Sequence, residues 1–201
     1  MSLRKKINST VMPFIAVCFL NCCFQTNINA QNRSISVYQY RHVPDDKIAE
    51  FIKRETTYWS KVAEKAAKEK KMTFWALLEK VGGYDLPNSS NFLFVNTFPD
   101  IDNTGDIWNN IEAVAGVKME AMETNSMSTV TSTFFVHEEN WAQDDKAVPE
   151  KDFNYIKMLY HNTNNPDSFI NLEKAHWQPF IQKSMNNNQT LQVGWGNARI
   201  L

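Results

Sequence analysis

A weak internal repeat constrains the fold of this chain more than any other feature. A pattern of aromatic and acidic residues, Phe51, Glu55, Tyr58-Trp59 and Trp75, returns as Phe169, Glu173, His176-Trp177 and Trp195. The helix-like part returns after 118 residues and the final tryptophan after 120 residues. Because a repeat at such a distance is typical of a duplicated folding unit, we expect two related units in this chain.

The first thirty residues have the pattern of an export signal. Arg4, Lys5 and Lys6 precede a mostly apolar run over residues 11–24, and Ala30 supplies a small residue for cleavage. We expect a signal peptide over 1–30, an exported protein that is periplasmic or secreted, and no membrane association after signal removal. A lipoprotein attached through Cys22 or Cys23 is the weaker alternative, because the preceding residues match a lipobox poorly.

The chain beyond the signal is free of cysteine and mildly acidic. All three cysteines lie in the first thirty residues, so thiol nucleophiles, disulfides and thiolate metal sites are excluded for the remainder. That remainder carries 18 Lys and Arg against 22 Asp and Glu. Nucleic acid is not expected as a partner, because its binding needs a clustered basic face.

The pattern of apolar residues predicts one complete folding unit over 35–141. Alternation predicts strands over 35–42, 72–81, 92–98 and 129–136, and helical spacing predicts a helix of about 25 residues after Pro44 and a shorter one ending near Gly116. The order strand, helix, strand, strand, helix, strand is that of a ferredoxin-like unit, βαββαβ.

A second unit begins after a charged linker over 142–152. We expect a strand over 153–161, a helix that starts at Asn165-Pro166-Asp167, and a strand over 191–201. The partial second unit, 153–201, would then lack its third strand, second helix and fourth strand. We expect that a truncated gene product explains this, and that residues 153–201 are the less ordered part.

The motifs resemble those of a known superfamily. Phe51-x-x-x-Glu55-x-x-Tyr58-Trp59, a lysine-rich helix end, Phe74-Trp75-Ala76-Leu77 and the strand 91–98 are similar to exported bacterial proteins of the dimeric α/β-barrel superfamily. The resemblance implies an α+β fold in which tandem ferredoxin-like units form a pseudo-dimeric α/β barrel, here with the second unit incomplete. The superfamily includes cofactor-independent quinol monooxygenases and haem-binding or haem-degrading proteins, so the resemblance alone does not define a function.

Glu55 and Glu173 are the most prominent candidates for chemistry, although no catalytic set can be identified. Each carboxylate lies at helical spacing with an apolar stripe, where it is costly unless paired or hydrogen-bonded. Two interpretations stay open: a pseudo-symmetric pair of general acid/base groups, or structural carboxylates that pair with a strand Arg or Lys. Similarly, His176 is either a ligand or proton shuttle, or an aromatic residue with a polar tip at the position of Tyr58.

The remaining histidines predict no metal site. His42, His137 and His161 each lie near the end of a predicted strand, without the spacing that brings several ligands together. Haem ligation needs a single histidine and stays open as an alternative. We expect no metal and no cofactor.

Strand alternation predicts a binding surface. Gln39 and Arg41 share one face of the first strand with Val37, and the repeat aligns Lys157 with Gln39. We expect this more polar face to line a cavity between the two units and to hold an anionic or carbonyl-bearing group. The predicted ligand-binding residues are Gln39, Arg41, Trp75, Asn96, Lys157 and Trp195.

These observations predict an exported α/β-barrel protein that binds an aromatic or hydrophobic metabolite between its two sheets. A cofactor-independent quinol-type monooxygenase and a haem-binding protein are the alternatives. The expected partners are a small-molecule ligand and, in a homodimer, a second copy of the chain.

Overall fold

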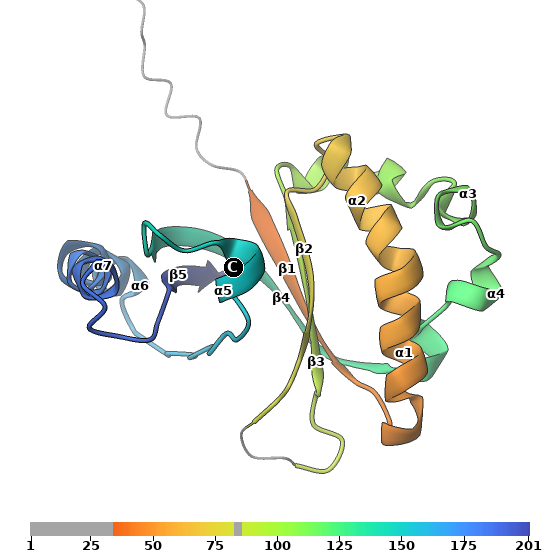
Figure 1. Cartoon of the computed structure of the whole chain (residues 1–201), viewed down its shortest axis with the longest axis horizontal. Helices are drawn as coiled ribbons and strands as arrows, with labels where there is room; N and C mark the ends of the chain where they lie inside the picture. The colour runs from red at the N-terminus through yellow and green to blue at the C-terminus, as the bar shows by residue number, and fades with distance from the viewer. Residues whose placement is uncertain (1–33, 83–85) are drawn as a thin grey trace, which may run out of the picture. The chain divides into compact units, whose positions relative to one another are not determined.

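The fold is α+β, with a single five-stranded antiparallel sheet. A computed structural model describes residues 34–82 and 86–201, so the signal predicted over 1–30 lies outside the described residues. The strands lie in the order β2-β3-β1-β4-β5 (Figure 1). They are β1 (Ile35–His42), β2 (Phe74–Glu79), β3 (Phe92–Phe98), β4 (Thr129–Gln143) and β5 (Gly194–Ile200).

The strand β4 joins the two parts of the sheet. Its first half pairs with β1, from Val136 opposite Ser36 to Thr129 opposite His42. Its second half pairs with β5. We expected β4 to end near Val136, but it continues to Gln143 because β5 supplies a hydrogen-bonding partner for this more polar half.

The helices follow the predicted order, with several short additions. Between β1 and β2 lie η1 (Asp45–Lys47), α1 (Ile48–Arg54), η2 (Glu55–Trp59) and α2 (Ser60–Lys68). Between β3 and β4 lie η3 (Ile101–Asn103), η4 (Gly105–Trp108), α3 (Ile111–Ala115), α4 (Met119–Met122) and η5 (Asn125–Met127). After β4 come α5 (Pro149–Asp152), α6 (Pro166–Leu172), η6 (Glu173–Trp177) and α7 (Gln178–Asn186).

One face of the sheet is covered by α1, η2 and α2 (Figure 1). Phe51 is fully buried and packs on Phe92 and Phe94 of β3, with ring centroids 5.1 and 6.0 Å apart. Further along, Ala63 and Ala66 pack with Phe98 and other core residues. The apolar stripe of the sequence is therefore the buried face of this helix.

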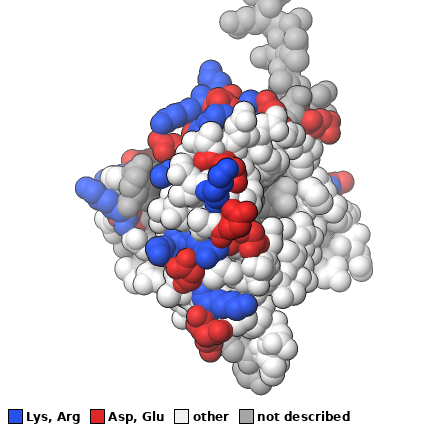
Figure 2. Space-filling model, turned by 90° about the vertical axis from the view of Figure 1, so that its right-hand side faces the viewer, with Lys and Arg blue, Asp and Glu red and all other residues white. Residues whose placement is uncertain are grey.

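The outer surface of α1 and α2 is covered by charges of both signs. Figure 2 shows Lys and Arg interspersed with Asp and Glu on this side of the molecule. Glu50–Arg54, Glu64–Lys68 and Lys65–Glu69 are ion pairs at a spacing of four residues. Exposed pairs of this kind support the helix by only a few tenths of a kcal/mol each, roughly.

The internal repeat has a counterpart in the helical elements. The segments α6, η6 and α7 begin and end 118 residues after α1, η2 and α2, and both η2 and η6 are π-helical turns. Lys70 and Asn188, also 118 residues apart, both adopt left-handed backbone angles, with φ of 59° and 54°. Because π turns account for well under 1 % of residues in proteins, their presence at both equivalent positions is independent support for a duplication.

The packing of the strand that follows each helix repeats as well. Trp75 of β2 packs with the cluster of Ala63 and Ala66. Trp195 of β5 packs with Ala142, Ile181 and Met185, and Ile181 follows Ala63 by 118 residues. Each copy thus places its helix over the tryptophan of the strand that follows.

The strand predicted over residues 153–161 is wrong. This segment has no regular secondary structure and forms no ladder in the described residues, and Tyr155 and Ile156 are 84 % and 64 % exposed. A strand requires a neighbour as well as suitable residues, and β5, the other strand of this copy, pairs with β4 instead. The two facing sheets that we expected are not present in the described residues, where a single sheet includes all five strands.

Candidate functional site

Four of the predicted ligand-binding residues come together, but beneath the helices. Val37 packs against the core cluster of Ala63, so its neighbours on alternate positions, Gln39 and Arg41, also face the helices. Trp75 and Asn96 lie opposite each other in β2 and β3, and Asn96 lies opposite Val37. Their expected location on a face away from the helices is therefore wrong. Ligand binding by these residues stays a prediction.

Arg41 tolerates this location because its guanidinium group makes three hydrogen bonds and lies over an aromatic ring. It lies over the ring of Phe94, 5.1 Å from the centroid. Its Nε donates to Gln39 Oε1 at 2.7 Å, and its Nη1 donates to Asn125 Oδ1 and Ser128 Oγ, each at 3.0 Å. The hydrogen bonds and the aromatic face offset the cost of burying the charge.

The other two predicted residues lie elsewhere. Lys157 is exposed on the segment 153–161, and Trp195 packs beneath α7. Neither residue therefore lies with the group around Arg41.

Glu55 is a buried carboxyl group at the start of the first π turn. It is only 4 % exposed, and Thr124 Oγ1 donates a hydrogen bond of 2.6 Å to its Oε1. Burial raises the pKa of Glu55 to about 7, although the hydrogen bond from Thr124 and the positive charge of Arg41 act in the opposite direction. The carboxyl group therefore changes charge near neutral pH.

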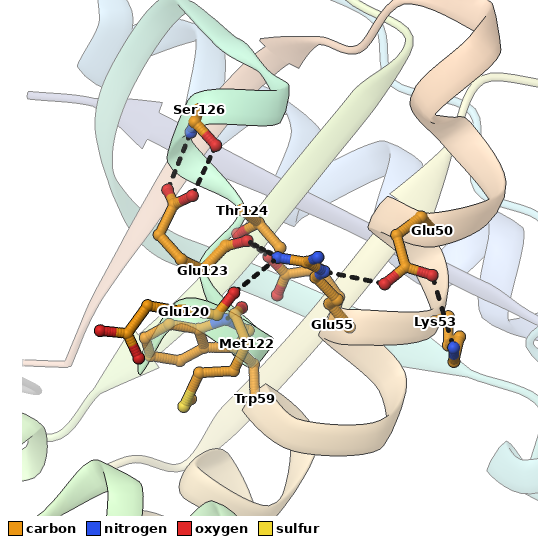
Figure 3. A network of polar contacts seen from close by, with 10 residues as sticks. Glu50, Lys53, Glu55, Trp59, Glu120, Met122, Glu123, Thr124 and Ser126 are labelled. Carbon is orange, nitrogen blue, oxygen red and sulfur yellow. Dashed lines mark hydrogen bonds and ion pairs between the residues drawn. The ribbon is translucent and has the colours of Figure 1, made fainter. Parts of the chain in front are cut away.

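The segment 119–127 covers the Glu55 carboxyl group. Trp59 Nε1 donates to the main-chain oxygen of Met122 at 2.8 Å, and Arg54 Nη1 donates to the oxygens of Glu120 and Glu123 at 3.2 and 2.8 Å. Figure 3 shows Met122, Glu123 and Thr124 of this segment beside Glu55 and Trp59. Because they cover the carboxyl group, the geometry favours the structural interpretation, a carboxylate held near a strand arginine, over general acid/base catalysis.

Glu173 occupies the same position in the second copy but in an open setting. It is partly buried and lines an open depression of about 470 Å³. The lining residues are Leu172, Glu173, His176, Trp177 and Phe180. The two glutamates are therefore equivalent in sequence and helix geometry but differ in what covers them.

A second group of residues gathers on the sheet face opposite α1. We call Tyr38, Tyr40, Phe134, Met158 and Tyr160 the tyrosine face. Tyr40 and Phe134 meet edge to face at 6.0 Å, and Phe134 and Tyr160 lie 6.2 Å apart. The Tyr40 hydroxyl is hydrogen-bonded to that of Tyr160 and lies 3.5 Å from Met158 Sδ.

The chemistry of the tyrosine face is that of neutral phenols. Burial, with Tyr160 nearby, raises the pKa of both Tyr38 and Tyr40 above the usual value for tyrosine. Both hydroxyl groups therefore stay protonated at neutral pH and serve as donors and acceptors beside aromatic rings. Such a surface suits flat aromatic molecules that carry a polar group.

The histidines lie apart from one another. His42 Nδ1 is 2.9 Å from the main-chain oxygen of Ser89, the rings of His161 and Phe169 are tilted to each other with centroids 5.7 Å apart, and His137 Nδ1 is 3.8 Å from Glu139 Oε1. Within residues 34–82 and 86–201, no three His, Cys, Asp or Glu side chains gather as metal ligands do. The same residues include no helix of the length and hydropathy that a membrane crossing requires.

Comparison with protein-family models, curated proteins and solved structures found no match to this chain. The class of protein is therefore defined by the fold, α+β with one five-stranded antiparallel sheet, and function must be argued from the surfaces themselves.

Two features of the sites were missed by sequence reasoning. Thr124, Asn125 and Ser128, which hold Glu55 and Arg41, lie in an irregular segment where no periodicity indicates a contact. The tyrosine face had a signal, because Tyr38 and Tyr40 alternate with Val37 and Gln39. Predicting the tyrosine face from the sequence required only the correct assignment of the strand face that packs on the helices.

Proposed function

We propose that this chain is an exported, non-catalytic binding protein for a small aromatic or hydrophobic molecule, and that the tyrosine face is its binding surface. The observation that carries the proposal is the convergence of Tyr40, Phe134 and Tyr160 from three separate parts of the chain. An aromatic surface with protonated hydroxyl groups binds flat ligands by stacking and by hydrogen bonds to their oxygens.

The architecture that we propose is a tandem of ferredoxin-like units with an incomplete second unit. The order β2-β3-β1-β4, with helices after β1 and after β3, agrees with a first ferredoxin-like unit. The repeated π turns support the duplication. In such a tandem the face of a sheet turned away from its helices meets the second unit, which is where Met158 and Tyr160 contact Tyr40.

A titration with small aromatic molecules tests the proposal. Protein fluorescence would be followed while phenols, quinols and aromatic carboxylic acids are added to the full chain. We expect saturable binding that weakens about tenfold in Tyr40→Ala and in Tyr160→Ala, because each substitution removes a stacking surface. Tyr155→Ala is the matched control, because Tyr155 is 84 % exposed and lies outside the tyrosine face. Equal affinities in all three variants would refute the binding surface.

The two alternatives from the sequence stay predictions and have direct tests. A quinol-type monooxygenase consumes oxygen when quinols are added to the protein. A haem-binding protein develops a Soret band with haemin, which weakens when its histidine ligand is replaced.

A further inference from the structure

The second copy of the repeated helix has an uncovered apolar face. Leu172, Trp177 and Phe180 are 57 %, 43 % and 56 % exposed, and they surround the depression that also includes Glu173 and His176. We call these five residues the open helix face. Three large apolar side chains at one place on a helix are typical of a surface that another chain covers.

The first copy shows what covers the equivalent face there. Tyr58 and Trp59 pack, together with Val62, against Ala115 and Met122 of the segment that includes α3 and α4. Beyond these apolar contacts, two polar groups of the helix are satisfied by the same segment. The indole Nε1 of Trp59 donates to the oxygen of Met122, and Glu55 accepts from Thr124 Oγ1.

The open helix face retains the groups that make these contacts. In the second copy, 118 residues later in the chain, Glu173 is equivalent to Glu55, Trp177 to Trp59 and Phe180 to Val62. The helical bounds and the π turn are the same, so the carboxylate, the indole and the apolar side chain have the same spacing. One position differs in character, because Leu172 replaces Arg54, which donates to main-chain oxygens in the first copy.

We propose that the open helix face binds a polypeptide segment of another chain, folded like residues 111–124. This segment presents small and methionine side chains to Trp177 and Phe180, a free main-chain oxygen to the indole Nε1 of Trp177, and a hydroxyl group to Glu173. It carries an apolar side chain opposite Leu172, where the first copy uses polar contacts to Arg54.

A second feature of the same copy supports this occupant. The segment 153–161 is equivalent in sequence to β1, which pairs with β3 on one side and β4 on the other. In the first copy, these two strands lie immediately before and after the segment that covers the helix. A partner that covers the open helix face with such a segment would therefore carry, before and after it, strands able to pair with 153–161, which forms no ladder in the described residues.

A peptide taken from this chain is the probe for the test. A fluorescent peptide with the sequence of residues 109–128 would be added to the full-length protein, and its anisotropy measured. We expect saturable binding, weakened about tenfold in the Phe180→Ala protein and in the Trp177→Ala protein. Phe135→Ala is the matched control, since Phe135 is 47 % exposed but lies on β4, and we expect it to bind the peptide within about twofold of the unaltered protein.

A second, altered peptide tests the same contact by changing the peptide instead of the protein. The peptide in which Ala115→Glu and Met122→Glu are combined places charges on the contacting face, and we expect it not to bind. Absence of saturable binding by the unaltered peptide would overturn the proposal. So would binding that is insensitive to Phe180→Ala but lost in Trp59→Phe, because the peptide would then exchange with the chain's own segment in the first copy. Circular dichroism confirms that each protein variant is folded.

Discussion

At the scale of single residues, the two copies of the repeat use the same side chains in different surroundings. Glu55 is 4 % exposed and accepts a hydrogen bond from Thr124, whereas Glu173 lines an open depression. Trp59 donates to a main-chain oxygen of the covering segment, whereas Trp177 is 43 % exposed. Matched substitutions in the two copies therefore separate the effect of burial from that of residue type.

Glu55 makes the stability of the protein depend on pH. Because its pKa rises from 4.5 in the unfolded chain to about 7 in the folded chain, folding favours the protonated form. The resulting stabilisation is complete below pH 4.5 and is lost as the pH rises through about 7. We expect the free energy of unfolding to fall by about 1–3 kcal/mol across this window, and the fall to disappear in Glu55→Gln.

Chemical denaturation at a series of pH values measures this dependence. Carboxylates with a lowered pKa, such as Glu50 and Glu64, titrate below the window and do not obscure it. Glu173→Gln is the control and should retain the slope of the unaltered protein. An unchanged slope in Glu55→Gln would show that this carboxyl group is not the origin of the dependence.

The indole of Trp59 contributes to the stability of the protein through one hydrogen bond. Trp59→Phe removes the donor to the oxygen of Met122 but keeps an aromatic ring in the cluster with Ala115. We expect a loss of about 1 kcal/mol in the free energy of unfolding. The same substitution at Trp177, whose side chain is 43 % exposed, should change the free energy of unfolding by less than about 0.5 kcal/mol. Equal losses at both positions would contradict the difference in surroundings.

At the scale of secondary-structure elements, the pairing of β4 with β5 is the feature that the sequence did not reveal. Glu138 lies opposite Ala198 in this register, and both side chains are exposed. In a chain with Cys18, Cys22 and Cys23 replaced by serine, we expect Glu138→Cys and Ala198→Cys to form a disulfide on mild oxidation, because opposite residues of antiparallel strands lie about 5 Å apart.

The control for this pair shifts the partner by one residue. Glu138→Cys with Arg199→Cys places the two thiols on opposite faces of the sheet, and we expect little cross-linking. Mass spectrometry of tryptic peptides distinguishes the two results. Efficient cross-linking of the shifted pair, with none of the aligned pair, would contradict the register.

The strands differ in how well the sequence alone predicts their bounds. The bounds of β1 and β3 agree with the predicted 35–42 and 92–98, because clear alternation or a continuous apolar run identifies a strand. Residues 153–161 have similar alternation but form no strand in the described residues, because a ladder also depends on a neighbour from elsewhere in the chain. The same limit explains why the continuation of β4 to Gln143 was missed, since its polar second half gains its partner only through β5.

At the scale of the whole molecule, both proposed surfaces include residues of the second copy of the repeat. The tyrosine face forms where Met158 and Tyr160, from the second copy, contact the first-copy strand β1. The open helix face repeats the helix and π turn of the first copy, and in the described residues no segment like 111–124 covers it. The repeat was visible in the sequence, whereas the position of β5 beside β4 depends on long-range packing that no local pattern encodes.

Amide hydrogen exchange compares the two copies directly, because the second copy has the helix of the first and the strand that follows it, whereas its first segment pairs with no strand in the described residues. We expect slow exchange in both helices, 48–68 and 166–186, slow exchange in β1, and fast exchange over 155–161. Equal protection of 155–161 and β1, or fast exchange throughout 166–186, would contradict this expectation.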